Sequence, residues 1–122
     1  MQTMLPRSHT EQYEDFLKSI RNLQKILSQP QPDLVSLKAG FQQSQWVYGQ
    51  QITTLTSENL DVDVASRWQS VQTEILRAWR LLQTEIVFLQ ASRSSSTSVA
   101  RLAAAQERLQ KLIDYCELML SS

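Results

Sequence analysis

The stretch WQSVQTEILRAWRLLQTEIVFLQA, residues 68–91, decides the fold of this chain. Its apolar side chains recur at steps of three and four residues, the spacing of one face of an α-helix. Together with the residues that precede it, the stretch predicts one helix over 63–91, roughly 42 Å long. The main apolar stripe of that helix consists of Val64, Trp68, Val71, Ile75, Ala78, Trp79, Leu82, Ile86 and Leu89.

Three further segments show the same spacing and predict helices over about 9–28, 34–55 and 98–120. Pro30 and Pro32 end the first helix, residues 56–62 form the longest connection, and the serine-rich residues 92–98 form the last turn. Four amphipathic helices with short connections predict an all-α fold, an antiparallel up-down-up-down four-helix bundle with a long third helix. At 122 residues, we expect 1–122 to be a single domain.

Side chains that can cap helices stand at each predicted start. Ser8 with Glu11 fits a capping box for the first helix, with Thr10 as a competing cap. Asp33 is the predicted cap of the second helix. The predicted caps of the last two helices are Asp61 or Asp63 for the third and Thr97 or Ser98 for the fourth. In the second helix, Gly40 and Gly49 weaken the pattern, and Gly49 could end the helix or kink it.

Composition and charge exclude several classes of protein. Twelve basic side chains balance twelve acidic ones, whereas a general nucleic-acid binder carries a basic excess. No apolar run approaches the ~20 residues of a membrane-spanning helix, and the N-terminus lacks the apolar region of a signal peptide. We therefore expect a cytoplasmic protein that binds neither nucleic acid nor membrane.

The residues that could carry chemistry are few. His9 is the one histidine, and it stands in a region predicted to fray, with no nucleophile or paired acid at motif spacing. Cys116, the one cysteine, falls on the apolar stripe of the last helix, where a thiol behaves as a small hydrophobe. No phosphate-binding loop, di-iron pattern or zinc-ligand set occurs. We expect no catalysis and no cofactor.

Some large apolar side chains lie outside the predicted stripes. Leu81 and Phe88 stand seven residues apart on the third helix, and Trp46 projects from the second. Arg77 and Arg80 flank the pair on the third helix and could form the rim of a site for an acidic partner. Exposed apolar clusters mark interfaces, but bundle helices also bury wide arcs. The sequence leaves open whether Leu81, Phe88 and Trp46 belong to the core or to a protein-binding surface.

Two C-terminal stretches carry a family resemblance, LLQTEIVFLQASR (81–93) and RLAAAQERLQKLIDYCELML (101–120). They are similar to cyanobacterial heterocyst-frequency-control proteins of the PatD type, with a looser likeness around Tyr13 and Phe16. The positions that match are Glu85, Phe88, Leu89, Gln90, Arg93, Arg101, Leu109, Tyr115 and Cys116. The resemblance covers about half of the chain.

The resemblance implies a non-enzymatic regulator that binds the tubulin-like division GTPase FtsZ, modulates its assembly, and links division to heterocyst differentiation. It supplies no binding motif, so the candidate contact residues remain Trp46, Arg77, Arg80, Leu81 and Phe88. Two alternatives stay open: a self-associating bundle that acts as an adaptor through a homodimer seam, and a bundle with a small-ligand pocket between its helices.

Overall fold

Four α-helices form the chain, as the apolar spacing predicts. The structure is a computed structural model that describes residues 5–92 and 94–121. In chain order the helices are α1 (Arg7–Leu27), α2 (Leu34–Val47), α3 (Val62–Ala91) and α4 (Ser95–Ser121), with a π-helical turn, η1 (Tyr48–Ile52), continuing α2. The described residues contain no strand. The prediction of an all-α four-helix bundle is confirmed.

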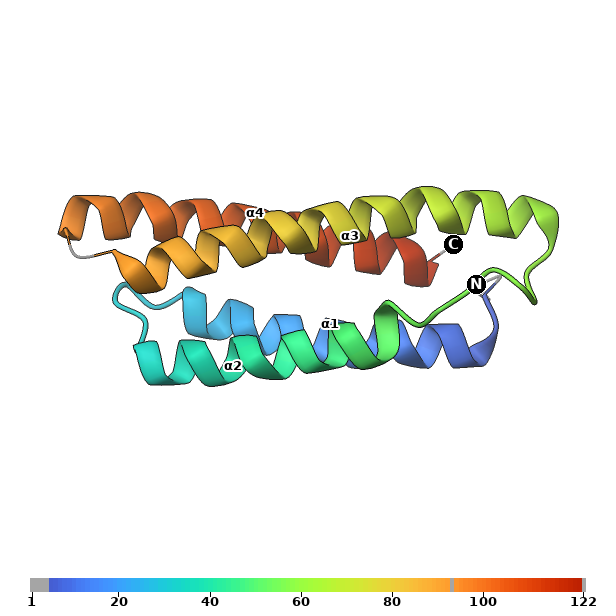
Figure 1. Cartoon of the computed structure of the whole chain (residues 1–122), viewed down its shortest axis with the longest axis horizontal. Coiled ribbons are helices and arrows are strands. Elements are labelled where there is room, and N and C mark those ends of the chain that lie inside the picture. The colour runs from blue at the N-terminus through green and yellow to red at the C-terminus, as the bar shows by residue number, and fades with distance from the viewer. Residues whose placement is uncertain (1–4, 93, 122) are drawn as a thin grey trace.

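The helices alternate in direction and form two layers, α1 with α2 and α3 with α4 (Figure 1). Close backbone packing joins α3 to α4 and joins α1 to both α2 and α4, whereas α2 and α3 approach less closely. Aromatic rings fill the wider space between α2 and α3. The Trp79 ring stacks on the rings of Tyr48 and Phe41, with centroids 4.8 and 5.5 Å away. This side of the bundle is therefore held together by side chains rather than by close helix contact.

The core follows the predicted stripes. In α3 every predicted stripe residue is buried except Val71, which is partly buried against the core. Cys116 is fully buried, as expected from its place on the α4 stripe. In the second predicted helix the spacing gives the stripe Leu34, Leu37, Phe41, Tyr48, Ile52 and Leu55, but its first member, Leu34, is exposed. Met119 lies outside the predicted stripe of the last helix and is buried near the end of α4.

Helix starts differ from the predicted caps. The capping box of Ser8 and Glu11 is wrong, because α1 begins at Arg7 with Pro6 in the cap position, and Glu11 instead pairs with Arg7. Asp33 caps α2 as predicted, accepting hydrogen bonds from the backbone N–H groups of residues 35 and 36. In α4 the cap is Ser94, whose Oγ accepts from the Thr97 N–H, so this helix starts three residues earlier than predicted.

The third helix begins close to its predicted start. Asp61 occupies the cap position of α3 without a side-chain capping bond, and Asp63 lies in the first turn. An acid in the first turn still stabilises the helix, because the N-terminal end of the helix dipole is positive.

The end of the second helix is the main local correction. A helix over 34–55 was predicted, with Gly49 as an alternative end or kink. The α-helical part ends at Val47, two residues before that glycine, and a π-helical turn follows to Ile52. A side chain of α3 fixes this ending: the Gln72 amide donates to the Ile52 carbonyl over 3.2 Å. Thr53 and Thr54 donate their hydroxyls to the carbonyls of Gly49 and Gln50. Side chains therefore donate hydrogen bonds to backbone carbonyls at the end of the helix, where the regular α-helical bonding pattern stops.

His9 also differs from expectation. It was placed in a frayed N-terminal region, yet it lies buried in α1 with its ring edge against Trp68. Because a carbonyl can only accept, the His9 Nε2–H donates to the Thr56 carbonyl over 2.8 Å. The histidine therefore fastens the connection between η1 and α3 to the start of α1.

Across the part of the chain that the structure describes, no helix is long and apolar enough to cross a membrane.

Candidate protein-binding surfaces

The structure separates the five predicted contact residues onto three surfaces. Arg77 and Leu81 line a groove on the outer side of the α3–α4 layer, and Phe88 continues the same flank of α3 toward its C-terminus. Arg80 lies in a different groove, between α3 and the end of α2. Trp46 stands on the outer face of α2. Three of the five therefore share one surface, and the other two do not belong to it.

The α3–α4 groove has an apolar line with charged sides. Leu81 is 40% exposed and Phe88 is 45% exposed, so neither is a core residue. The groove, of about 150 Å³, is lined by Glu74, Arg77, Ala78 and Leu81 from α3 and by Arg108, Lys111 and Tyr115 from α4. Side chains seven residues apart on a helix lie on one flank about 10.5 Å apart along the axis. Leu81 and Phe88 therefore offer two apolar contact points in a row.

Cations outnumber carboxylates along this groove. The Arg77 guanidinium lies 3.6 Å from Glu74, and that of Arg101 lies 3.5 Å from Glu85. In the described chain, Arg108 and Lys111 form no ion pair, so two cations are left for a ligand. The Arg77–Glu74 pair is exposed, and exposed ion pairs are weak and exchange partners readily, whereas the Glu85 side chain of the other pair is only 17% exposed. The groove therefore favours an acidic ligand with apolar side chains.

Two of the four cations, Arg108 and Lys111, are residues that the sequence did not single out. Together with Arg101 they stand on the flank of α4 that faces α3, and Tyr115 is one turn further along. Their spacing of seven, three and four residues was visible in the sequence as one helical face. Its importance depends on α3 and α4 lying antiparallel, which places Arg101 against Phe88 and Arg108 near Leu81.

The groove that holds Arg80 has a different character. It is lined by Gln45, Tyr48, Gly49, Leu76, Trp79, Arg80 and Gln83, with Arg80 as its one charged member. Burial raises the pKa of the Tyr48 hydroxyl, and the Arg80 charge opposes that rise. The phenol stays neutral across the physiological range, so this groove holds a single positive charge and offers a partner little charge complementarity.

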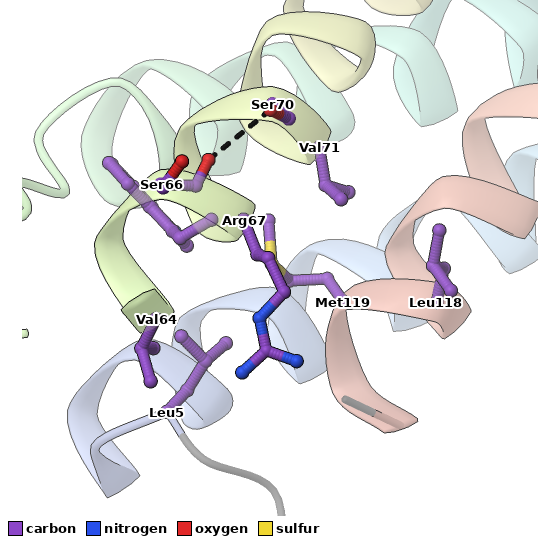
Figure 2. Close-up of a pocket in the computed structure, with 9 residues that line it drawn as sticks. Leu5, Val64, Ser66, Arg67, Ser70, Val71, Leu118 and Met119 are labelled. Atoms are coloured by element: carbon purple, nitrogen blue, oxygen red, sulfur yellow. Dashed lines mark hydrogen bonds between the residues drawn. The ribbon is translucent and has the colours of Figure 1, made fainter. Parts of the chain in front are cut away.

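A third hollow lies at the end of the bundle, where the start of α3 meets the end of α4 (Figure 2). It measures about 390 Å³, and its walls are mainly apolar side chains, including Leu5, Val64, Trp68 and Met119. Figure 2 shows the Arg67 side chain extending between Leu5 and Met119. The small-ligand alternative calls for an internal pocket with polar groups placed on its walls. Ser66, Arg67 and Ser70 also line this hollow, so it has polar groups beside its apolar walls, and the small-ligand alternative stays a prediction.

Buried polar side chains form a chain of hydrogen bonds that links the helices. The Trp68 indole N–H donates to the Tyr13 hydroxyl over 2.7 Å, and that hydroxyl donates to Gln72 Oε1 over 2.7 Å. Through the Gln72 amide the chain of bonds continues to the Ile52 carbonyl. Burial raises the pKa of Tyr13 above its usual range, so its hydroxyl remains a donor. Residue spacing alone does not predict this network, because Gln72 lies among the polar residues beside the α3 stripe.

Cys116 and the possible metal ligands were the remaining candidates for chemistry among the described residues. Burial raises the pKa of the Cys116 thiol to about 12, which keeps it protonated and unreactive. Within residues 5–92 and 94–121, no cluster of three or more His, Cys, Asp and Glu side chains could hold a metal ion.

Comparison of the chain with protein-family models, with curated proteins and with solved structures finds no match in any of the three. The fold defines the class of protein as an up-and-down four-helix bundle with an apolar, cation-lined groove on one layer. Of the positions that carry the PatD resemblance, Phe88, Glu85, Arg101 and Tyr115 lie on or beside that groove, and Arg93 lies outside the described residues. The resemblance itself stays a prediction.

Proposed function

We propose that this chain is a non-enzymatic regulatory protein that binds another protein through the α3–α4 groove. The observation that carries this proposal is the partial exposure of Leu81 and Phe88 on one flank of α3, beside Arg77, Arg101, Arg108 and Lys111. A monomeric protein gains nothing from leaving two large apolar side chains in a row at its surface. As a binding site, the same arrangement supplies apolar anchors inside a charged rim.

The groove fits a particular kind of ligand, an amphipathic helix with acidic residues beside its apolar stripe. Such a helix presents apolar side chains at steps of three, four and seven residues, which matches the spacing of Leu81 and Phe88. Its carboxylates would meet Arg108 and Lys111. Charge complementarity of this kind accelerates association and selects against basic partners.

The PatD resemblance supplies a candidate partner, the division GTPase FtsZ, and a candidate role in setting the frequency of heterocyst differentiation through FtsZ assembly. The resemblance alone names FtsZ, and the groove supplies a surface on which a protein partner would bind.

The test is sedimentation of FtsZ polymers, with FtsZ from the same source, in the presence of this protein. We expect the protein to appear in the polymer pellet and to change the pelleted mass of FtsZ. Arg108→Glu reverses a charge in the groove and should reduce co-sedimentation. Arg80→Glu makes the same change in the other groove and should not.

Two results would count against the proposal in different ways. If the protein neither pellets with FtsZ nor alters its polymer mass, FtsZ is not the partner. If FtsZ binds and the two arginine variants lose binding equally, the α3–α4 groove is not the site.

A further inference from the structure

The outer face of α2 is unusual among the surfaces of this bundle because it is almost uncharged. Lys38 is the one charged side chain of α2 and η1 together. The other three helices carry charges of both signs along their lengths. The exposed positions of α2 are instead occupied by glutamine, serine and apolar residues. Depletion of charge is the compositional mark of the centre of a protein interface.

Apolar side chains also stand on this face. Trp46 is 62% exposed and Val35 is 78% exposed. With Ala39 and Gln42, which are exposed between them, they form one line spaced by four, three and four residues. That spacing is the seam of two helices that pack against each other. We call this line, Val35, Ala39, Gln42 and Trp46, the α2 seam.

We infer that the α2 seam binds the α2 seam of a second copy of this chain, antiparallel, with the two-fold axis at Gln42. A face whose one charge is Lys38 meets its own copy with little repulsion between like charges, and it offers a charged partner a single group to pair with. A two-fold interface also requires one patch to complement itself. The charge pattern is the reason for choosing a second copy of the chain as the binding partner. This choice does not depend on the proposed function of the α3–α4 groove.

The antiparallel register makes the seam self-complementary. About an axis at Gln42, Trp46 of one copy faces the partner's Lys38, since both lie four residues from the axis. An ammonium over an indole ring is a favourable cation–π contact. Val35 likewise faces the partner's Gly49, seven residues from the axis on the other side. A Cβ built at Gly49 meets nothing within 4 Å, so there is space for the valine side chain.

The size of the seam sets the strength of the dimer. Nineteen residues, 14 in α2 and 5 in η1, make an interface helix about 28 Å long. One pair of such helices buries less than the ~1,600 Å² of a standard stable interface. The dimer should therefore be reversible and depend on concentration, with no obligate dimer in dilute solution.

A matched pair of substitutions tests the inference by analytical ultracentrifugation over a wide concentration range. The wild-type mass should rise from 14.0 kDa toward twice that value. Val35→Glu places an unpaired charge in the seam and should weaken association by about tenfold or more. Val62→Glu makes the same change at a position that is 85% exposed and off the seam, and it should associate like the wild type. Both positions lie in the first turn of a helix, where a new acid suits the dipole, so both variants should fold.

A second measurement tests the register. Cys116 is buried, so a cysteine introduced on the seam is the accessible thiol among the described residues. Gln42→Cys should form a covalent dimer under mild oxidation. Gln50→Cys, eight residues from the axis, should not, because antiparallel copies would hold the two sulfurs about 24 Å apart.

Four outcomes would overturn the inference. A wild-type protein that stays at 14.0 kDa at every concentration removes the dimer. If Val35→Glu and Val62→Glu form dimers with equal affinity, the dimer interface does not lie at the α2 seam. Faster disulfide formation at Gln50→Cys than at Gln42→Cys rejects an axis at Gln42, and equally fast formation at both shows a parallel pairing.

Discussion

The guanidinium of Arg101 lies 4.6 Å from the centroid of the Phe88 ring and joins α4 to α3 across the outer groove. The same guanidinium lies 3.5 Å from Glu85, so one cation is shared between a carboxylate and an aromatic face. Phe88 is therefore partly covered without being part of the core.

This relationship predicts a large difference between two neighbouring substitutions. Phe88→Ala removes a half-exposed ring and one cation–π contact, which at an exposed site is worth ~0.5–1 kcal/mol. Ile86 is fully buried, and Ile86→Ala should cost ~2–5 kcal/mol. Urea unfolding of both variants measures the difference. Equal losses would mean that Phe88 is a core residue and would withdraw it from the proposed groove.

The buried hydrogen-bond chain gives a second prediction. Tyr13→Phe keeps the ring but leaves the Trp68 N–H and Gln72 Oε1 without their partner, and each buried unpaired group costs ~1–3 kcal/mol. Tyr115→Phe makes the same change at a partly buried hydroxyl on α4 and should alter the free energy of unfolding by little. Trp68 fluorescence should also shift in the first variant. Equal stability of the two variants would show that the chain of bonds does not stabilise the fold.

The predictions for α2 and α3 show which features of the fold the sequence contains and which it does not. The α3 stripe was predicted because helical spacing and burial coincide there, with one flank facing the core. The π-helical turn after Val47 was not predicted, because it depends on Gln72, a residue 20 positions after Ile52 in the chain. Arg108 was missed at the groove for a similar reason. No property of α4 alone shows which flank faces Leu81.

Alkaline pH should destabilise the fold. The thiol of Cys116 has a folded-state pKa of about 12, against ~8.5 in an unfolded chain, and burial also raises the pKa of Tyr13. A raised pKa means that the folded state holds the proton more tightly, so the contribution is complete below the unfolded pKa and is lost as pH rises above it. The urea midpoint should therefore fall between pH ~9 and ~12.

Cys116→Ala separates this titration from general alkaline unfolding. The variant should be less stable at neutral pH, because it leaves a small cavity, but its urea midpoint should fall less steeply above pH ~9. The pH dependence of the urea midpoint that remains in the variant comes partly from the titration of Tyr13. A slope as steep as that of the wild type would show that Cys116 does not contribute.

The two glycines of the second helix should respond differently to alanine. Gly49 has a helical backbone with no positive φ, and a Cβ there meets nothing, so Gly49→Ala should stabilise the monomer by ~0.5–1 kcal/mol. A Cβ at Gly40 would lie 2.7 Å from Ile26 Cδ1, so Gly40→Ala requires that side chain to move and should gain less. Thermal unfolding measures both. A greater gain at Gly40 than at Gly49 would contradict the packing described between α1 and α2.

If the groove and the α2 seam both act as proposed, the protein should bridge polymers of its partner. In Figure 1, α2 belongs to one layer and α3 and α4 to the other. The groove is lined by α3 and α4 alone, so a dimer through α2 keeps both copies of it free. A bivalent molecule can hold two polymers together even when its own dimer is weak, because binding along a polymer raises the effective concentration. Low-speed sedimentation of FtsZ separates bundles from single polymers and measures the effect.

The variants distinguish bridging from simple binding. Val35→Glu should still pellet with FtsZ at high speed but should lose the bundles, whereas Arg108→Glu should lose both. Val62→Glu should retain both, since it changes neither surface. Bundles that persist in Val35→Glu while the ultracentrifuge shows a monomer would mean that one molecule carries two binding sites, and the bridge would not pass through α2.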